Sequence, residues 1–201
     1  FHGHHKFSEL PVRTYLCTRM SVRQFIIYDL EATCWRSPKP RQVEIIEIGA
    51  VKVNEYLEIV DEFCLFIKPL LHPKIDKFCT KLTSITQEDV DDAPHFNEAI
   101  KLFENWMDVK NTRTALFSWG DFDKRQFYKD ADLHELKLDW LKYWACLQMH
   151  YSKFKGSSNQ IGLKNALKLE GLEFDGVQHR AIEDARNMAE LFIKVAKPLG
   201  I

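Results

Sequence analysis

The sequence contains no run of about 18 apolar residues, which argues against a membrane-spanning helix. It also has no excess of either charge, because 28 Lys and Arg residues face 29 Asp and Glu residues for a formal net charge of −1. Without an overall basic field, a polyanion would have to be bound at a local site. With 45% hydrophobic and 28% charged residues, the 201-residue chain is neither disordered nor collagen-like, and its length predicts one domain.

Paired cysteines are missing as well. The cysteines are odd in number and scattered, and they form neither a Cys-x-x-Cys pair nor a Cys and His cluster with zinc-site spacing. They are Cys17, Cys34, Cys64, Cys79 and Cys146. This pattern excludes a disulfide scaffold and predicts reduced thiols in a cytoplasmic protein.

Residues 1–21 lack a sustained period and contain His2, His4 and His5 close together. They also lack the apolar stretch of about 7–15 residues that a secretory signal requires. Two interpretations remain open, a remnant of a purification tag and a native arm that packs on the domain. We therefore treat 1–21 as an N-terminal arm and expect the functional domain to span 22–201.

Periodicity and turn residues predict alternating strands and helices in the rest of the chain. Strands are expected at 25–28 and 114–119 and in a hairpin formed by 45–53 and 59–67; helices are expected at 96–107, at 163–169 before Gly171, and from 181 to 195. The segment 37–40 reads as an exposed loop, 69–86 as an irregular connection with one helical turn, and 140–151 as either strand or helix. This order indicates a mixed sheet flanked by helices in a single α/β domain.

Acidic residues stand at the ends of several predicted elements. Asp29 and Glu31 close the first strand and, because side chains alternate along a strand, they project to the same side. Like charges side by side are unfavourable without a cation, and Mg²⁺ prefers oxygen ligands. A solvated pair of carboxylates is the alternative for these two residues.

Asp121 and Asp123 follow the strand at 114–119, where either residue serves equally well as a helix N-cap or as a further carboxylate at the site. Asp184 lies on the core-facing side of the last helix, where burial of an unpaired carboxylate is costly. His179 comes from the preceding loop and suits a general base, although a surface histidine is the alternative. Together these acids predict two metal ions about 3.5–4 Å apart that promote in-line attack on a phosphodiester.

The ordered set of motifs resembles the DEDDh 3′–5′ exonucleases, within them the subfamily of the histone-mRNA 3′ exonuclease and its RNA-interference-regulating relatives. The resemblance covers about residues 24–195 and rests on six segments, 29–34, 44–50, 82–87, 120–123, 171–176 and 179–185. It implies an RNase H-like fold with a mixed five-stranded sheet flanked by helices. One departure is Ser84, which stands where the family usually has glycine.

The resemblance also implies roles for individual residues. Asp29, Glu31, Asp123 and Asp184 would bind two Mg²⁺ or Mn²⁺ ions, and His179 would be the general base. The terminal nucleotide would contact Ala32, Thr33, Thr83, Ile85 and Phe122. Basic residues that could contact phosphates are Arg36, Lys39, Arg41, Lys153, Lys155 and Arg180.

These features predict a metal-dependent 3′–5′ exonuclease that removes nucleoside 5′-monophosphates from the 3′ ends of single-stranded nucleic acid, RNA in preference to DNA, with no membrane partner. Two alternatives remain, a phosphodiesterase of small oligonucleotides and a catalytically idle nucleic-acid-binding regulatory module of the same fold. The complete set of acids and histidine argues against the idle module, because binding alone does not require a general base.

Overall fold

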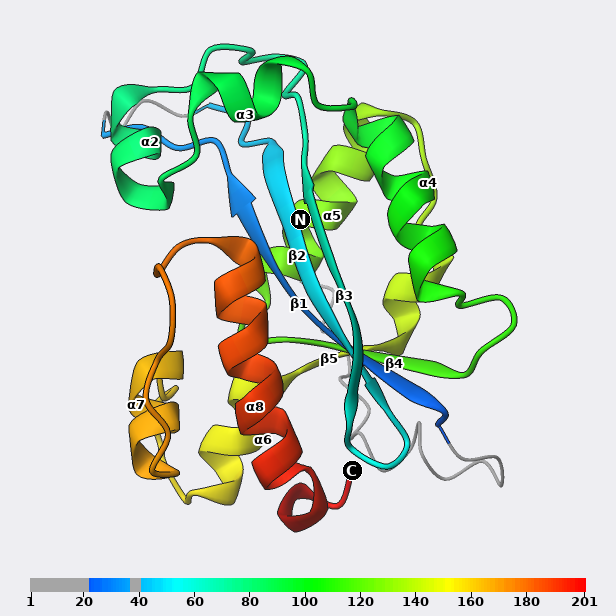
Figure 1. Ribbon diagram of the computed structural model, residues 1–201, viewed down its shortest axis with the longest axis vertical. Coiled ribbons are helices and arrows are strands. Elements are labelled where there is room, and N and C mark those ends of the chain that lie inside the picture. The colour runs from blue at the N-terminus through cyan, green and yellow to red at the C-terminus, as the bar shows by residue number, and fades with distance from the viewer. Residues whose placement is uncertain (1–21, 37–40) are drawn as a thin grey trace, which may run out of the picture.

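A computed structural model describes residues 22–36 and 41–201 of the chain. The N-terminal arm with its three histidines, Cys17 and the predicted loop at 37–40 lie outside the described residues. The described part forms a five-stranded sheet in the order β3-β2-β1-β4-β5, with helices on both faces (Figure 1). The predicted α/β domain with a mixed sheet is therefore confirmed.

The sheet combines an antiparallel half with a parallel half. Its strands are β1 (Gln24–Ala32), β2 (Ile45–Asn54), β3 (Ile59–Phe66), β4 (Thr114–Ser118) and β5 (Trp144–Cys146). The neighbours β1, β2 and β3 run antiparallel, which confirms the predicted hairpin, whereas β4 is parallel to β1 and β5 is parallel to β4. The mixed character follows because helical segments connect the parallel strands.

The helices follow the predicted order with additions. They are α2 (Lys77–Thr83), α3 (Gln87–Asp91), α4 (Phe96–Met107), α5 (Phe122–Leu133), η1 (Asp139–Tyr143), α6 (Leu147–Phe154), α7 (Leu163–Leu169) and α8 (Ala181–Leu199). Residues 69–86, expected to be irregular with one helical turn, contain all of α2, whose N-cap Asp76 accepts a hydrogen bond from the backbone N–H of Phe78. The ambiguous segment 140–151 contains a strand and parts of two helical elements.

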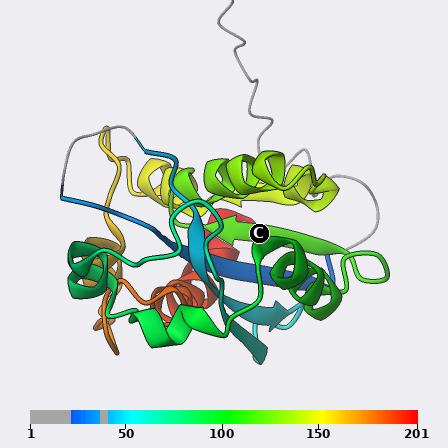
Figure 2. The same cartoon turned by 90° about the horizontal axis from the view of Figure 1, so that it is seen from above.

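The two faces of β1 serve different parts of the protein. Ile26, Tyr28 and Leu30 pack in the core that α4 and α5 cover. Phe25 and Ile27 point the other way, into the core that α8 covers with Ala185, Met188 and Phe192. Figures 1 and 2 show α5 and α8 on opposite faces of the sheet. Since the alternation continues along β1, Asp29 and Glu31 lie on the α8 side, beyond the apolar pair.

The first turn of α8 approaches the sheet very closely at Gly49 of β2. A Cβ added at Gly49 would lie 2.1 Å from the backbone nitrogen of Ile182 and 2.2 Å from the carbonyl carbon of Ala181. Gly49 is paired with Asp29 in the sheet. Only glycine allows this approach, so residue 49 determines how near the start of α8 comes to the β1 carboxylates.

We predict that Gly49→Ala destabilises the protein by about 1–3 kcal/mol, because a side chain there forces the backbone of α8 away from the sheet. Urea unfolding measures the change. The matched control is Gly162→Ala, where a Cβ would meet nothing within 4 Å. Because Gly162 is the N-cap of α7, where alanine is less favourable than glycine, its cost should stay below about 1 kcal/mol. Equal losses in the two variants would contradict the prediction.

Candidate active site

Three carboxylates from two distant segments meet at one end of the sheet. Asp29 and Glu31 come from β1, and Asp184 comes from the first turn of α8. One ligand oxygen from each residue lies within 4.8 Å of the other two. The sequence-predicted pair and the third acid are thus brought together, in an arrangement that can hold a divalent cation through oxygen ligands.

The electrostatics of this cluster favour a bound cation. Burial, followed by the negative charge of Asp123, raises the pKa of Asp29 well above its ordinary value. Burial and the charge of Asp184 raise the pKa of Glu31 to about 8, and burial also raises the pKa of Asp184. Within the described part of the chain, no Lys or Arg forms an ion pair with any of the three acids. The acids therefore suit a divalent cation, which would compensate their charge.

Asp123 and Asp121 differ sharply in their surroundings. Asp123 lies in the first turn of α5 and is buried, and burial raises its pKa to about 7. It is close enough to Asp29 to raise the pKa of that residue, although it is not among the three acids within 4.8 Å of one another. Asp121 holds the N-cap position without a capping hydrogen bond and instead pairs with Arg125 at 3.2 Å. Its carboxylate is solvated.

His179 lies on the solvent side of the cluster. Its side chain is exposed, and its backbone has a left-handed φ of 62°. The backbone N–H of His179 donates a hydrogen bond of 2.9 Å to Oδ2 of Asp184. The backbone of His179 is thereby held next to an acid of the cluster while its side chain remains accessible to water, which suits a general base.

The five residues expected to contact the nucleotide lie around β1, α2 and α5 with different exposures. Ala32 and Thr33 are buried at the end of β1, and the backbone N–H of Thr33 donates to the carbonyl of Glu44. Thr83 and Ile85 are also buried, whereas Phe122 is 44% exposed. Ser84 between the two buried residues has a φ of 63°, the conformation for which glycine is usual.

Several of the predicted phosphate contacts are already engaged. Arg180 forms an ion pair with Glu47, and Lys155 forms one with Glu170. The guanidinium of Arg41 lies 4.7 Å from the ring centre of Trp35. Arg36 and Lys153 are exposed, and Lys39 lies outside the described residues.

Sequence reasoning missed Glu47, which is fully buried on β2 directly opposite Glu31. A signal was present, because a charged residue inside a continuous β-branched strand is costly to bury without a partner.

The sheet topology and the converging carboxylates define a nuclease of the RNase H-like class. Residues 26–192 match the family model described as Exonuclease, RNase_T, and the chain belongs to this exonuclease family. Within it, the chain is a member of the DEDDh group that contains the 3′–5′ exoribonucleases. The resemblance predicted from the motifs is therefore confirmed.

Two curated relatives and one solved structure illustrate the similarity. The chain is 33% identical over 178 residues to 3′-5′ exoribonuclease 1 of Homo sapiens, covering 84% of this chain and 51% of the relative. It is 32% identical over 200 residues to ERI1 exoribonuclease 2 of Xenopus laevis, covering 87% and 29%. The nuclease domain of 3′hExo, described as a DEDDh family member bound to rAMP, superimposes with a TM-score of 0.83 at 29% identity, covering 88% and 93%. The chain thus spans about half or less of the length of these curated relatives.

We predict that Asp29→Asn raises the melting temperature in excess EDTA, because it removes one charge from a cluster without a counterion. Each 1 kcal/mol of relieved repulsion corresponds to about 2–4 °C in a protein of this size. The sign follows from the raised pKa: the native state holds the proton more tightly than the unfolded state, so ionisation at neutral pH opposes folding.

Differential scanning fluorimetry at neutral pH, with EDTA or with Mn²⁺, measures both states. Wild type should gain more stability from Mn²⁺ than the variant, since ligand binding to the native state stabilises it. A variant that melts below wild type in EDTA would contradict the repulsion within the cluster, and a variant that gains as much stability from Mn²⁺ as wild type would contradict a metal role for Asp29.

Proposed function

We propose that this chain is a metal-dependent 3′–5′ exonuclease that removes nucleoside 5′-monophosphates from the 3′ ends of single-stranded nucleic acid. The observation that carries the proposal is the convergence of Asp29, Glu31 and Asp184 on one point, with His179 bonded beside them, in a member of the exonuclease family. A phosphodiester bond is the substrate that such a set of acids suits.

In this proposal, Asp29, Glu31, Asp123 and Asp184 hold two Mg²⁺ or Mn²⁺ ions. The ions supply Lewis-acid stabilisation of the charge that develops on the phosphodiester. Because the pKa values of these acids are raised and a carboxylate must lose its proton to act as a ligand, cation binding would be accompanied by proton release. His179 takes the proton of the attacking water from the solvent-exposed side.

The end of the strand would be held by residues around the acids. Phe122 offers an exposed ring beside buried Asp123, on which a base can stack. Because the side chains of Thr83 and Ile85 are buried, they would shape the wall behind the terminal nucleotide. Ala32 and Thr33 would contact the nucleotide through their backbone atoms. The relatives named exoribonuclease support RNA over DNA as substrate.

The location of the activity is also part of the proposal. None of the described cysteines is in a disulfide, which supports the cytoplasmic location expected from the sequence. Among residues 22–36 and 41–201, every helix is too short or too polar to cross a bilayer.

The test is cleavage of 5′-labelled single-stranded RNA and DNA oligomers of the same sequence with Mg²⁺ or Mn²⁺. We expect a descending ladder, faster on RNA, with no cleavage in excess EDTA or by the Asp29→Ala variant, because the acids alone do not hydrolyse a phosphodiester. Cleavage restricted to oligomers of a few nucleotides would instead indicate a small-oligonucleotide phosphodiesterase. Retention without cleavage would indicate an idle binding module.

The same assay assigns the acid from α5. We predict that Asp123→Ala abolishes most of the activity, because this buried carboxylate lies close enough to Asp29 to raise its pKa. We expect Asp121→Ala to retain the activity, because that carboxylate is solvated and pairs with Arg125. The two variants are matched in chemistry and lie two residues apart. An inactive Asp121 variant beside an active Asp123 variant would reverse the assignment.

A further inference from the structure

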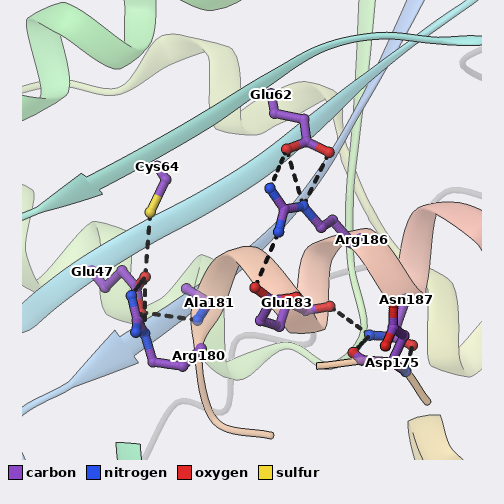
Figure 3. A network of polar contacts seen from close by, with 9 residues as sticks. All are labelled: Glu47, Glu62, Cys64, Asp175, Arg180, Ala181, Glu183, Arg186 and Asn187. Carbon is purple, nitrogen blue, oxygen red and sulfur yellow. Dashed lines mark hydrogen bonds and ion pairs between the residues drawn. The ribbon is translucent and has the colours of Figure 1, made fainter. Parts of the chain in front are cut away.

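Glu47 is a fully buried carboxylate whose contacts all lead to the start of α8 or to β3 (Figure 3). It accepts hydrogen bonds from the guanidinium of Arg180, at 3.2 Å from Nε and 3.0 Å from the Nη2 nitrogen. It also accepts one of 3.0 Å from the backbone N–H of Ala181, and Sγ of Cys64 lies 3.4 Å from it. A buried charge requires such complete pairing.

Glu47 stands directly opposite Glu31 in the β1–β2 pair, and its charge is one of those that raise the pKa of Glu31. The guanidinium of Arg180 nevertheless engages both of its carboxylate oxygens, which ties Glu47 to the start of α8. Glu47 is accordingly not one of the acids that lie within 4.8 Å of one another. Instead, Glu47 holds Arg180 and Ala181, the residues at the start of α8.

The loop that leads into α8 is held at Arg180 by Glu47, and it is also held at its other end, at Asp175. The side chain of Asn187, buried on α8, accepts a hydrogen bond of 2.9 Å from the backbone N–H of Asp175 and donates one of 2.7 Å to its carbonyl (Figure 3). Between Asp175 and Arg180 lie only residues 176–179, all of them exposed. The exposed stretch that carries His179 is thus short and tied at both ends.

We propose that Glu47 and Arg180 are positioning residues for His179: their ion pair, in which Glu47 is buried and Arg180 partly exposed, fixes the residue next to the general base and so aims the imidazole at the acids. This inference rests on the proposed exonuclease function. The proposed metal ligand Asp184 has a further support, because the contact of Ala181 and Ile182 with Gly49 also holds the first turn of α8 against the sheet.

A purely structural role makes a different prediction. Replacing a buried ion pair by uncharged residues of similar size is often neutral for stability, whereas removing one partner leaves an uncompensated charge. The double variant Glu47→Gln/Arg180→Met should therefore melt closer to wild type than Arg180→Met alone. If the pair served stability only, activity would return together with the melting temperature.

The experiment measures kcat and KM on a single-stranded RNA oligomer, the melting temperature, and its shift with Mn²⁺. For the double variant we expect kcat to fall about 10–100-fold with KM and the Mn²⁺ shift retained, because misplacement of a reacting group by about 1 Å costs that much. The control is Glu62→Gln, which breaks the exposed ion pair between Glu62 of β3 and Arg186 of α8; it should leave kcat unchanged.

His179→Ala provides the decisive comparison. We expect it to lower kcat by about 10²–10⁴-fold, and we expect Glu47→Gln/Arg180→Met to add almost no further loss in that background, since the pair acts through His179. The proposal would be overturned if Glu47→Gln/Arg180→Met lowered kcat as much in the His179→Ala background as in wild type. It would also be overturned if the double variant kept the wild-type kcat.

Hydrogen exchange of residues 176–181 separates this inference from the proposed function. The double variant should exchange faster there than Glu62→Gln does, whether or not the protein degrades RNA. Absence of a cleavage ladder would therefore refute the exonuclease function, whereas unchanged exchange in this segment would refute the positioning role.

Discussion

The first turn of α8 lies on the backbone of β2 at Gly49, and the acidic cluster depends on this contact. Ala181 and Ile182 occupy the space that a Cβ at residue 49 would need, and Gly49 is itself paired with Asp29. A start of α8 farther from the sheet would carry Asp184 away from the β1 carboxylates. The apolar side of the helix determines its direction along the core, whereas Gly49 determines how closely its first turn approaches.

The cluster is held in place at a cost to stability. Burial and mutual repulsion raise the pKa values of its acids, so their charged forms oppose folding when no cation is bound. The apolar residues that continue the same two elements, Phe25 and Ile27 on β1 and Phe192 on α8, offset this cost by burial on the same face of the sheet. Stability and function thus compete within a few residues of each other, as is common at active sites.

Some parts of the fold and the site could be predicted from the sequence alone, and others could not. The alternation of β1 and the apolar stripe of α8 are local patterns, and they sufficed to place Asp29 and Glu31 on one face of the strand and Asp184 on the core-facing side of the helix. That the helix covers the same face of the sheet is a long-range fact, which only the resemblance to the exonucleases implied. Residues 140–151 were ambiguous because the three-residue strand β5 is defined by pairing with β4 rather than by its own composition. Helix α3 escaped notice, although its capping box between Thr86 and Asp89 is a readable signal.

Glu47 illustrates the limit of such reasoning most clearly. Its partner Arg180 lies 133 residues away, and nothing local to either residue reveals the other. The fold brings them together beneath the exposed loop that carries His179. If His179 is the general base that we propose, its imidazole must reach solvent and must also keep a constant direction. Anchors at Arg180 and at Asp175, both supplied by buried side chains, reconcile these demands, because they immobilise the ends of the loop and leave its middle open. Rigidity at this site therefore comes from the layer beneath the loop rather than from the loop itself.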